Sequence, residues 1–287
     1  MREIRVAYSK INNAGDLLNE YLLERVFSVP YVRDVSAWTL EMTGIGSFLD
    51  ILFLQKKLTK QSIKKGLKYI YEKPQQYECV TWGTGFIKDF GKDLKKPIRK
   101  NINFMAVRGE KSKDCLEKVL GKKISPVLGD GGILVSYLLE KKNQKKYSIS
   151  IIPHFREYNC RQIEEIKNKY QNIHIIDLRN SALEVIKQID ESEIILSSSL
   201  HGLIMADSLR VPNKRIYFTD KPLGTGFKFD DYYSAYGLTE TAKIIRNAND
   251  LPSNNEIIDS YKVTDSMVDK MKKDMYNCMK DYLITRT

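Results

Sequence analysis

Apolar segments of strand length alternate with amphipathic segments of helical length along most of this 287-residue chain. The apolar runs predict strands at residues 4–9, 79–82, 104–107, 126–128, 147–152, 173–178, 194–196 and 215–218. The segments between them predict helices at residues 17–26, 108–120, 133–139, 161–170, 183–189 and 202–209. Strands that alternate with helices form parallel sheets covered by the helices, so the sequence predicts an α/β fold.

A polar, lysine-rich segment at residues 140–146 interrupts this alternation. We therefore expect two Rossmann-like domains facing across a cleft, formed by residues 1–140 and 147–287, with residues 140–146 as the linker. A long C-terminal helix is expected at residues 260–284, because apolar residues recur there at every fourth position. Several of these residues are methionines, which we expect to fill the core.

Composition narrows the class of protein. Hydrophobic residues make up 42% of the chain and charged residues 29%, which is typical of a soluble globular protein. No run of apolar residues is long enough to span a bilayer, and the chain starts with a predicted strand, so a cytoplasmic protein without a signal peptide is expected. The four cysteines are far apart in the sequence, and no metal-ligand spacing is present. Neither a metal nor a cofactor is expected.

The chain carries a net charge of +11, with basic clusters at residues 56–73, 88–100 and 141–146. Such a charge suits nucleic acid, an anionic membrane or a phosphorylated substrate. No nucleic-acid-binding motif accompanies it, so no nucleic-acid partner is expected. Two interpretations of the basic clusters remain: solvated helix faces, or a surface that contacts the anionic inner face of a membrane or a phosphorylated carrier.

Polar residues and glycines gather directly after the predicted strands. In open parallel sheets, ligands bind beyond the carboxyl ends of the strands. We therefore expect these residues to line the cleft: Asn13, Gly15, Asp16, Gly83, Thr84, Gly85, Arg108, Asp130, His154, Arg156 and residues 197–202.

The run SSSLHG at residues 197–202 is the most informative of these strand ends. It leads from a predicted strand into a predicted helix, and the free amides at a helix N-terminus favour anions. The serines add hydroxyl donors, and Gly202 lets the backbone approach a neighbour closely. A histidine at this place can act as a general acid or base, so His201 is the leading catalytic candidate.

Two further strand ends offer groups for an anionic ligand. His154 is the second candidate for proton transfer, and Arg156 presents a planar fork that suits carboxylate or phosphate. Arg108 stands at a helix start, where its charge opposes the helix dipole unless an anion binds there. The third histidine, His174, lies inside a predicted strand and is interpreted as structural.

Several common nucleotide and hydrolase motifs are absent from the sequence. Residues 83–85 lack the complete GxGxxG pattern of dinucleotide-binding enzymes, and no GxxxxGK[ST] loop is present. The serine run does not match the GxSxG nucleophile elbow. The sequence therefore speaks against a nicotinamide enzyme, a P-loop nucleotidase and an α/β-hydrolase.

Seven short motifs in a fixed order resemble the polysaccharide pyruvyl transferase family. They are NAGD at 13–16, WGTG at 82–85, VRGEKS at 107–112, LGD at 128–130, IPHF at 152–155, SLHG at 199–202 and FKFDDY at 227–232. The resemblance implies a GT-B-like two-domain fold. It also implies a reaction that moves the enolpyruvyl unit of phosphoenolpyruvate onto two hydroxyls of a sugar, giving a cyclic pyruvate ketal and phosphate.

The resemblance also implies roles for individual residues. His201 would bind the donor and act as the acid–base group. As a separate hypothesis, His154 moves the protons instead of His201 or orients the acceptor. The expected donor-binding residues are Arg108, Arg156, Ser198, Ser199, Leu200 and Gly202. The expected acceptor side of the cleft comprises Asn13, Gly15, Asp16, Gly83, Thr84, Gly85, Asp130 and Lys228. The acceptor would be a sugar of a cell-surface polysaccharide precursor, carried on either a lipid or a nucleotide.

The chain departs from the family pattern at Ser199, where some members carry an arginine that grips the donor. Either Arg156, Lys214 or Lys228 replaces the lost positive charge, or the donor is held differently. Two rival functions remain open. One is a GT-B glycosyltransferase that uses a nucleotide-sugar, and the other is a non-catalytic sugar-binding assembly protein on the same scaffold.

Overall fold

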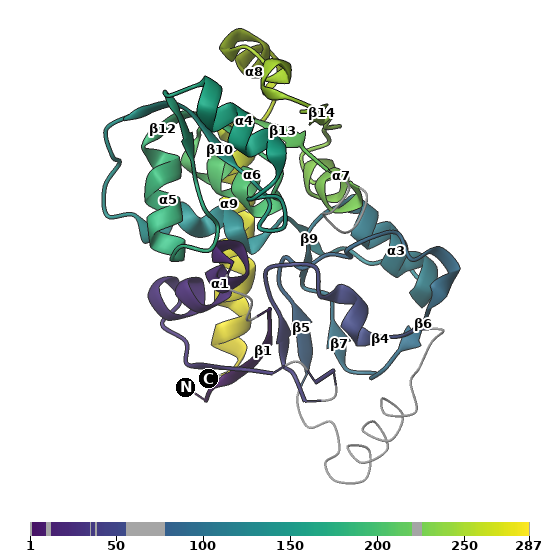
Figure 1. Cartoon of the computed structure of the whole chain (residues 1–287). Coiled ribbons are helices and arrows are strands. Elements are labelled where there is room, and N and C mark those ends of the chain that lie inside the picture. The colour runs from purple at the N-terminus through teal and green to yellow at the C-terminus, as the bar shows by residue number, and fades with distance from the viewer. Residues whose placement is uncertain are drawn as a thin grey trace.

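The computed structural model describes residues 2–9, 13–34, 36–37, 39–55, 78–219 and 226–286. The basic run at residues 56–73 therefore lies outside the described residues, whereas the runs at 88–100 and 141–146 lie inside them. Within the described ranges the protein is a mixed α/β structure with two five-stranded sheets (Figure 1).

The first sheet is formed by the N-terminal half of the chain and has the strand order β2-β1-β3-β5-β7. All its neighbouring strands are parallel, as the sequence predicts. Its strands are β1 (Ile4–Ala7), β2 (Tyr31–Arg33), β3 (Met42–Thr43), β5 (Cys79–Thr81) and β7 (Ile102–Asn103). Two small ribbons accompany it, an antiparallel pair of β4 (Phe53–Gln55) and β6 (Leu94–Pro97) and a parallel pair of β8 (Ala106–Val107) and β9 (Val127–Leu128).

The second sheet is formed by the C-terminal half and has the order β11-β10-β12-β13-β14, again with parallel neighbours throughout. Its strands are β10 (Tyr147–Ile152), β11 (Ile173–Ile175), β12 (Ser192–Ser197), β13 (Asn213–Tyr217) and β14 (Lys243–Ile244). Strand β10 lies between β11 and β12, so the segments that follow β10 and β12 emerge side by side. This adjacency brings the histidine-bearing segments after residues 152 and 197 together.

Helices connect the strands in both halves (Figure 1). The α-helices are α1 (Ala14–Tyr21), α3 (Glu110–Leu120), α4 (Arg161–Lys169), α5 (Ala182–Asp190), α6 (Leu200–Leu209), α7 (Phe227–Ser234), α8 (Asn254–Ser260) and α9 (Asp265–Thr285). A π-helix, Leu22–Val26, continues α1, and short 3₁₀ helices occupy η2 (Leu49–Leu52), η3 (Gly91–Asp93), η4 (Gly131–Leu138) and η5 (Ala248–Asp250). None of the helices in the described ranges is both long and apolar enough to cross a membrane.

Several expected elements differ from those observed. The helix expected at residues 133–139 is the 3₁₀ helix η4, which begins earlier because Asp130 Oδ1 accepts a hydrogen bond from the Gly132 amide. The helix expected at residues 260–284 is α9, which begins only at Asp265, because residues 261–264 are non-helical and the Thr264 side chain caps α9 by accepting from the Met267 amide. Ser260 instead ends the separate helix α8, which was not expected. The first helix begins at residue 14 rather than 17, because the Asn13 side chain caps it by accepting from the Gly15 amide.

Helix α9 runs along both halves of the molecule, although it belongs to the C-terminal part of the sequence (Figure 1). The indole of Trp82 donates to the carbonyl of Met275 at 3.1 Å, and Lys272 Nζ donates to the carbonyl of Ser208 at 2.7 Å. Met271, Met275 and Met279 are buried in one apolar core that draws residues from both halves, which confirms the predicted methionine stripe.

Residues 140–146 form neither helix nor strand, and they are tied to the second half by hydrogen bonds. Lys145 Nζ donates to the carbonyls of Asp190 and Ser192 at 2.8 and 2.7 Å. The two halves are also bonded directly, because the Ala14 amide at the start of α1 donates to the carbonyl of Leu178 at 2.7 Å. Whether residues 140–146 separate two domains stays a prediction.

Candidate active site

His201 lies in the first turn of α6. The sequence had instead placed it in the loop before the helix. The helix begins at Leu200, because Ser199 adopts an extended N-cap conformation with φ −107° and ψ 132°. The Ser197 hydroxyl at the end of β12 fixes this turn by accepting from the Ser199 amide at 3.0 Å. The first amides of a helix have no acceptor within the helix, so the backbone around His201 offers donors to an anion.

Two glycines allow other segments to approach this turn. A Cβ at Gly202 would collide with the Ser197 hydroxyl and with Ile152 of β10. A Cβ at Gly15 would collide with the imidazole ring of His201 itself. Gly15 stands in the first turn of α1, because Asn13 caps that helix by accepting from the Gly15 amide at 3.0 Å. The N-termini of α1 and α6 therefore meet at the His201 ring.

The imidazole of His201 packs against Gly15, and one of its ring nitrogens makes no hydrogen bond among the described residues. Its Nε2 is buried and has no hydrogen-bond partner among the described residues. Loss of hydration lowers the pKa of His201 to about 3, and the charges of Lys228 and Arg108 add to the effect. A histidine with that pKa is neutral at pH 7.

His154 follows β10 and sits beside the serine run. Its amide donates to the Ser198 hydroxyl at 2.8 Å, and its Nδ1 accepts from the Arg156 amide at 3.3 Å. Loss of hydration lowers the pKa of His154 to about 4, with the charges of Lys228 and Arg156 adding to the effect. A neutral ring that accepts at Nδ1 carries its proton on Nε2 and can donate it there.

Lys228, in the first turn of α7, is the charged group shared by these residues. Its charge acts on His154, on His201 and on Asp16 of α1. Loss of hydration lowers the pKa of the Lys228 amine to about 8, and Arg108 adds to the effect. The pKa of Asp16 is raised to about 6 by loss of hydration, and the charge of Lys228 opposes that rise. The structure thus brings four of the expected residues into one electrostatic cluster.

Glu157 joins this cluster, although it was not among the expected site residues. It is fully buried, and its Oε1 accepts from the Thr219 amide at 2.8 Å and the Thr219 hydroxyl at 2.9 Å. Its Oε2 is buried without a hydrogen-bond partner in the described residues, and its charge acts on Lys228. A sequence signal could have identified Glu157 as a site residue: it lies in the turn after β10, three residues after His154.

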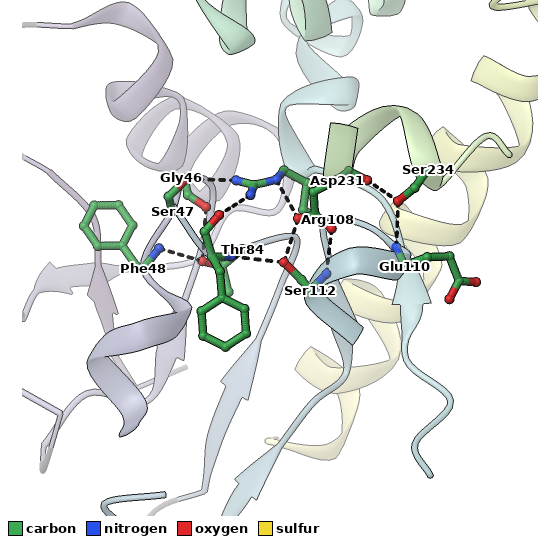
Figure 2. A network of polar contacts seen from close by, with 10 residues as sticks. Gly46, Ser47, Phe48, Thr84, Arg108, Glu110, Ser112, Asp231 and Ser234 are labelled. Atoms are coloured by element: carbon green, nitrogen blue, oxygen red, sulfur yellow. Dashed lines mark hydrogen bonds and ion pairs between the residues drawn. The ribbon is translucent and has the colours of Figure 1, made fainter. Parts of the chain in front are cut away.

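Arg108 is fully buried, and all three nitrogens of its guanidinium donate to protein groups. Nε pairs with Asp231 Oδ2 at 3.0 Å, and Nη1 donates to the Ser47 hydroxyl at 2.9 Å (Figure 2). Nη2 donates to the Phe86 carbonyl at 2.5 Å. Neither Asp231 nor Ser47 was among the expected site residues. The donor-binding role that the family resemblance implies for Arg108 stays a prediction.

Other expected cleft residues have structural contacts in the first half. Gly85 lies against the Arg108 guanidinium, and the Thr84 hydroxyl donates to the Gly46 carbonyl at 3.2 Å. Gly83, at φ 77°, lies against the backbone of Gly131, where a Cβ would not fit. Asp130 is fully buried and caps η4, and loss of hydration raises its pKa to about 6.

The three candidates for replacing the charge lost at Ser199 lie in different places. Arg156 is exposed, with its guanidinium over the Phe155 ring at 5.6 Å. Lys214 donates to the Ser260 hydroxyl at 3.1 Å. Lys228 is the one whose charge acts most on His201.

In the described part of the chain, no group of three His, Cys, Asp or Glu side chains is arranged to hold a metal ion.

Comparison with known proteins decides the family. The model of the polysaccharide pyruvyl transferase family matches residues 67–213, just over half of the chain. The chain belongs to this family. It is 30% identical over 234 residues to the succinoglycan biosynthesis protein ExoV of Rhizobium meliloti, an alignment covering 80% of this chain and 64% of that protein. It is also 32% identical over 137 residues to an uncharacterized protein of Acanthamoeba polyphaga mimivirus, covering 46% of this chain and 47% of the other.

This member of the pyruvyl transferase family aligns with less than two thirds of the length of either relative. Among solved structures, S. aureus MnaA in complex with UDP resembles this chain with a TM-score of 0.50 at 12% identity, covering 99% of this chain and 97% of MnaA. At that identity the likeness concerns the fold alone. It agrees with the parallel sheets described above.

Proposed function

We propose that this protein is a pyruvyl transferase that uses phosphoenolpyruvate as donor and a sugar as acceptor. One observation carries the proposal: the unpartnered Nε2 of His201 is buried in the first turn of α6, within reach of the charge of Lys228. A helix N-terminus and a lysine suit an anionic donor, and a neutral imidazole suits proton transfer. Family membership supports the same reaction class.

The donor would be held by the first-turn amides of α6, by the hydroxyls of Ser198 and Ser199 and by Lys228. Phosphoenolpyruvate is strongly anionic at neutral pH, and fixed donors aimed at such charge stabilise it at little reorganisation cost. In this arrangement Lys228 provides the positive charge that Ser199 lacks. Arg156, exposed beside His154, would meet the donor or acceptor from the solvent side.

The chemistry requires an acid and a base in turn, which suits a histidine. The methylene carbon of the donor gains a proton, and a sugar hydroxyl bonds to the central carbon and loses its proton. The second hydroxyl then bonds to the same carbon, its proton leaves with phosphate, and the carbon–oxygen bond to phosphate breaks. His201 would move these protons, since a bound anion raises its lowered pKa towards the working pH.

We propose a GT-B-like arrangement in which residues 1–140 and 147–287 are two Rossmann-like domains facing across a cleft. The two parallel five-stranded sheets and the fold likeness to MnaA over the whole chain support it. Asn13, Gly15 and Asp16 would form the wall opposite His154 and His201. The acceptor sugar would bind between these walls, beside the point where Gly15 touches the His201 ring.

The acceptor would be a sugar of a cell-surface polysaccharide precursor, in keeping with the similarity to a succinoglycan biosynthesis protein. We propose that the reaction occurs in the cytoplasm, with the protein bound peripherally at the inner face of the membrane. The net charge of +11 supports contact with an anionic surface. Sedimentation with anionic vesicles at low salt should therefore be lost at high salt, and an absence of binding at low salt would reject the membrane contact.

The rival function is transfer of a sugar from a nucleotide-sugar, favoured only by the likeness in fold to a UDP-bound protein. Ligand-induced shifts in melting temperature separate the two. Phosphoenolpyruvate should raise the melting temperature of the wild-type protein, whereas UDP- and GDP-sugars should leave it unchanged. The opposite pattern would reject the pyruvyl transferase in favour of the glycosyltransferase. Binding of a sugar without turnover would favour a non-catalytic assembly protein.

A further inference from the structure

Helix α7 is bonded to the first half of the molecule through a buried carboxylate. Asp231 accepts from Arg108 Nε at 3.0 Å, from the Ser112 amide at 2.7 Å and from the Ser112 hydroxyl at 2.6 Å (Figure 2). The side chains of Asp231 and Arg108 are both 0% exposed. Truncating one partner of such a buried pair leaves the other charge uncompensated, so the pair holds α7 and α3 together.

The backbone contacts at this junction are equally close. A Cβ at Gly109 would collide with the Asp231 carbonyl, so only glycine lets the start of α3 meet α7 here. The Ser234 hydroxyl donates to the Asp231 carbonyl at 2.5 Å and accepts from the Glu110 amide at 2.9 Å (Figure 2). The first turn of α3 is thus fixed to the last turn of α7.

The next residue bonds α7 to the second half. The Tyr232 hydroxyl donates to Asp207 Oδ2 at 2.9 Å, and both residues are fully buried. Asp207 belongs to α6, the helix whose first turn carries His201. Adjacent residues of α7 therefore hold it against α3 on one side and α6 on the other.

Lys228 lies three residues before Asp231 on the same helix. Among the described residues, no hydrogen bond or ion pair holds its amine. Its charged neighbours come from several elements, and they are Arg108, Asp16, Arg215, Glu157, His154 and His201. The amine lies 5.3 Å from the centre of the Phe229 ring, which belongs to the same helix. The backbone of α7 therefore sets the position of both groups, and the bonds of Asp231 and Tyr232 fix that backbone.

We infer that Asp231, paired with Arg108 and Ser112, is a positioning residue that holds Lys228 in the donor site by fixing α7. The inference rests on the proposed function, in which Lys228 binds the anionic donor. It also gives Arg108 a second role, because its three nitrogens donate to Asp231, Ser47 and Phe86. Arg108 acts on the donor through α7 and through its charge.

The test compares Asp231→Asn with Asp230→Asn. Both changes remove one negative charge from α7, but Asp230 is 38% exposed and does not bond to α3 through a buried pair. It pairs with the exposed Lys111 at 3.2 Å and, more weakly, with Arg215 at 3.9 Å. The first readout is the titration midpoint of Lys228, measured as the pH dependence of its acetylation by acetic anhydride with peptide mass spectrometry. This readout does not depend on any enzymatic activity.

Asp231→Asn should raise the Lys228 midpoint from near 8 towards the ordinary lysine value, because a released α7 lets water reach the amine. Asp230→Asn should leave the midpoint unchanged. A midpoint that stays or falls in Asp231→Asn would overturn the inference, since loss of a negative charge from a fixed helix can only lower it. Should Asp231→Asn fail to fold, Ser234→Ala removes the bond to the Asp231 carbonyl and should shift the midpoint in the same direction by less.

The second readout is the binding of phosphoenolpyruvate in a double-mutant cycle. Asp231→Asn and Lys228→Met should each weaken binding at least about tenfold, and the double variant should bind no worse than Lys228→Met. Independent losses that multiply in the double variant would assign Asp231 a purely structural role and overturn the inference. If wild-type protein binds no phosphoenolpyruvate, the proposed function fails, while the Lys228 midpoint still decides the positioning role.

Discussion

The charge of Lys228 should set the alkaline limit of donor binding. Loss of hydration and the charge of Arg108 lower its pKa to about 8 from an ordinary value of 10.5. An amine with that pKa is roughly nine-tenths protonated at pH 7 and one-tenth protonated at pH 9. Since the protonated form attracts the anion, phosphoenolpyruvate should bind about tenfold more weakly at pH 9 than at pH 7. A lysine of ordinary pKa would give a flat profile over this range.

The assay is calorimetric titration of phosphoenolpyruvate into wild-type protein and Lys228→Met at pH 7, 8 and 9, at constant ionic strength. The variant should bind at least about tenfold more weakly than wild type at pH 7, because a charge-assisted contact is lost, and its affinity should not change with pH. Lys214→Met is the matched control, since Lys214 donates to Ser260 and should leave the wild-type profile intact.

Two results would refute this reasoning. One is a wild-type affinity that stays constant between pH 7 and pH 9. The other is a Lys228→Met variant that keeps the tenfold change, because another group would then carry the titration. The pKa values of His154 and His201 are lowered to about 4 and 3 in the free protein, so a histidine could produce this profile only if donor binding raised its pKa well above 7. Asp16, with its pKa raised to about 6, is already ionised over most of the range.

Three further predictions concern the residues around Lys228. Gly15→Ala should place a methyl group against the His201 ring, lowering turnover and costing about 1–3 kcal/mol of unfolding free energy, measured by urea denaturation. The folded-state pKa of His201 is lowered, so its contribution to stability is present above about pH 6.5 and is lost as the pH falls towards the folded value. Between pH 7 and pH 5, the unfolding free energy of wild type should therefore fall by up to about 2 kcal/mol more than that of His201→Gln. An equal fall in both proteins would contradict a buried neutral imidazole. Glu157→Gln removes a charge that raises the pKa of Lys228, so the alkaline limit of donor binding should move to lower pH; an unchanged limit would place Glu157 too far from the amine.

The sequence pattern predicted the parallel sheets and every strand of the second sheet except β14, because those strands contain short apolar runs. It missed β2, β3 and β7 of the first sheet, which are only two or three residues long. It also predicted that the segments after β10 and β12 carry the site, and the structure brings His154 and His201 together there, near Lys228. The start of α6 was placed two residues too late, since Ser199 caps the helix through its backbone conformation and its side chain makes no capping hydrogen bond. Caps of that kind leave little signal in the sequence.

The contacts between the two halves were beyond sequence reasoning. The motif at residues 227–232 was recognised only as a family feature, and no helix was expected there. Its role depends on the pairing of Asp231 with Arg108, 123 positions apart in the chain. Likewise, the bond from Trp82 to Met275 spans 193 positions, so that nothing local marks α9 as a support for the first sheet. Such pairings become visible only once the chain is folded.

The most direct test of the central claim is phosphate release from phosphoenolpyruvate in the presence of candidate sugar acceptors, with mass spectrometry of the product. Wild-type protein should release phosphate only when an acceptor is present, one phosphate for each pyruvate ketal formed. His201→Ala should keep its fold, as judged by thermal melting, while its turnover falls at least about 100-fold. A His201→Ala variant with near wild-type turnover would contradict the assignment of His201 as the acid–base group. Wild-type protein that instead transfers sugar from a nucleotide-sugar, without releasing phosphate from phosphoenolpyruvate, would contradict the account as a whole.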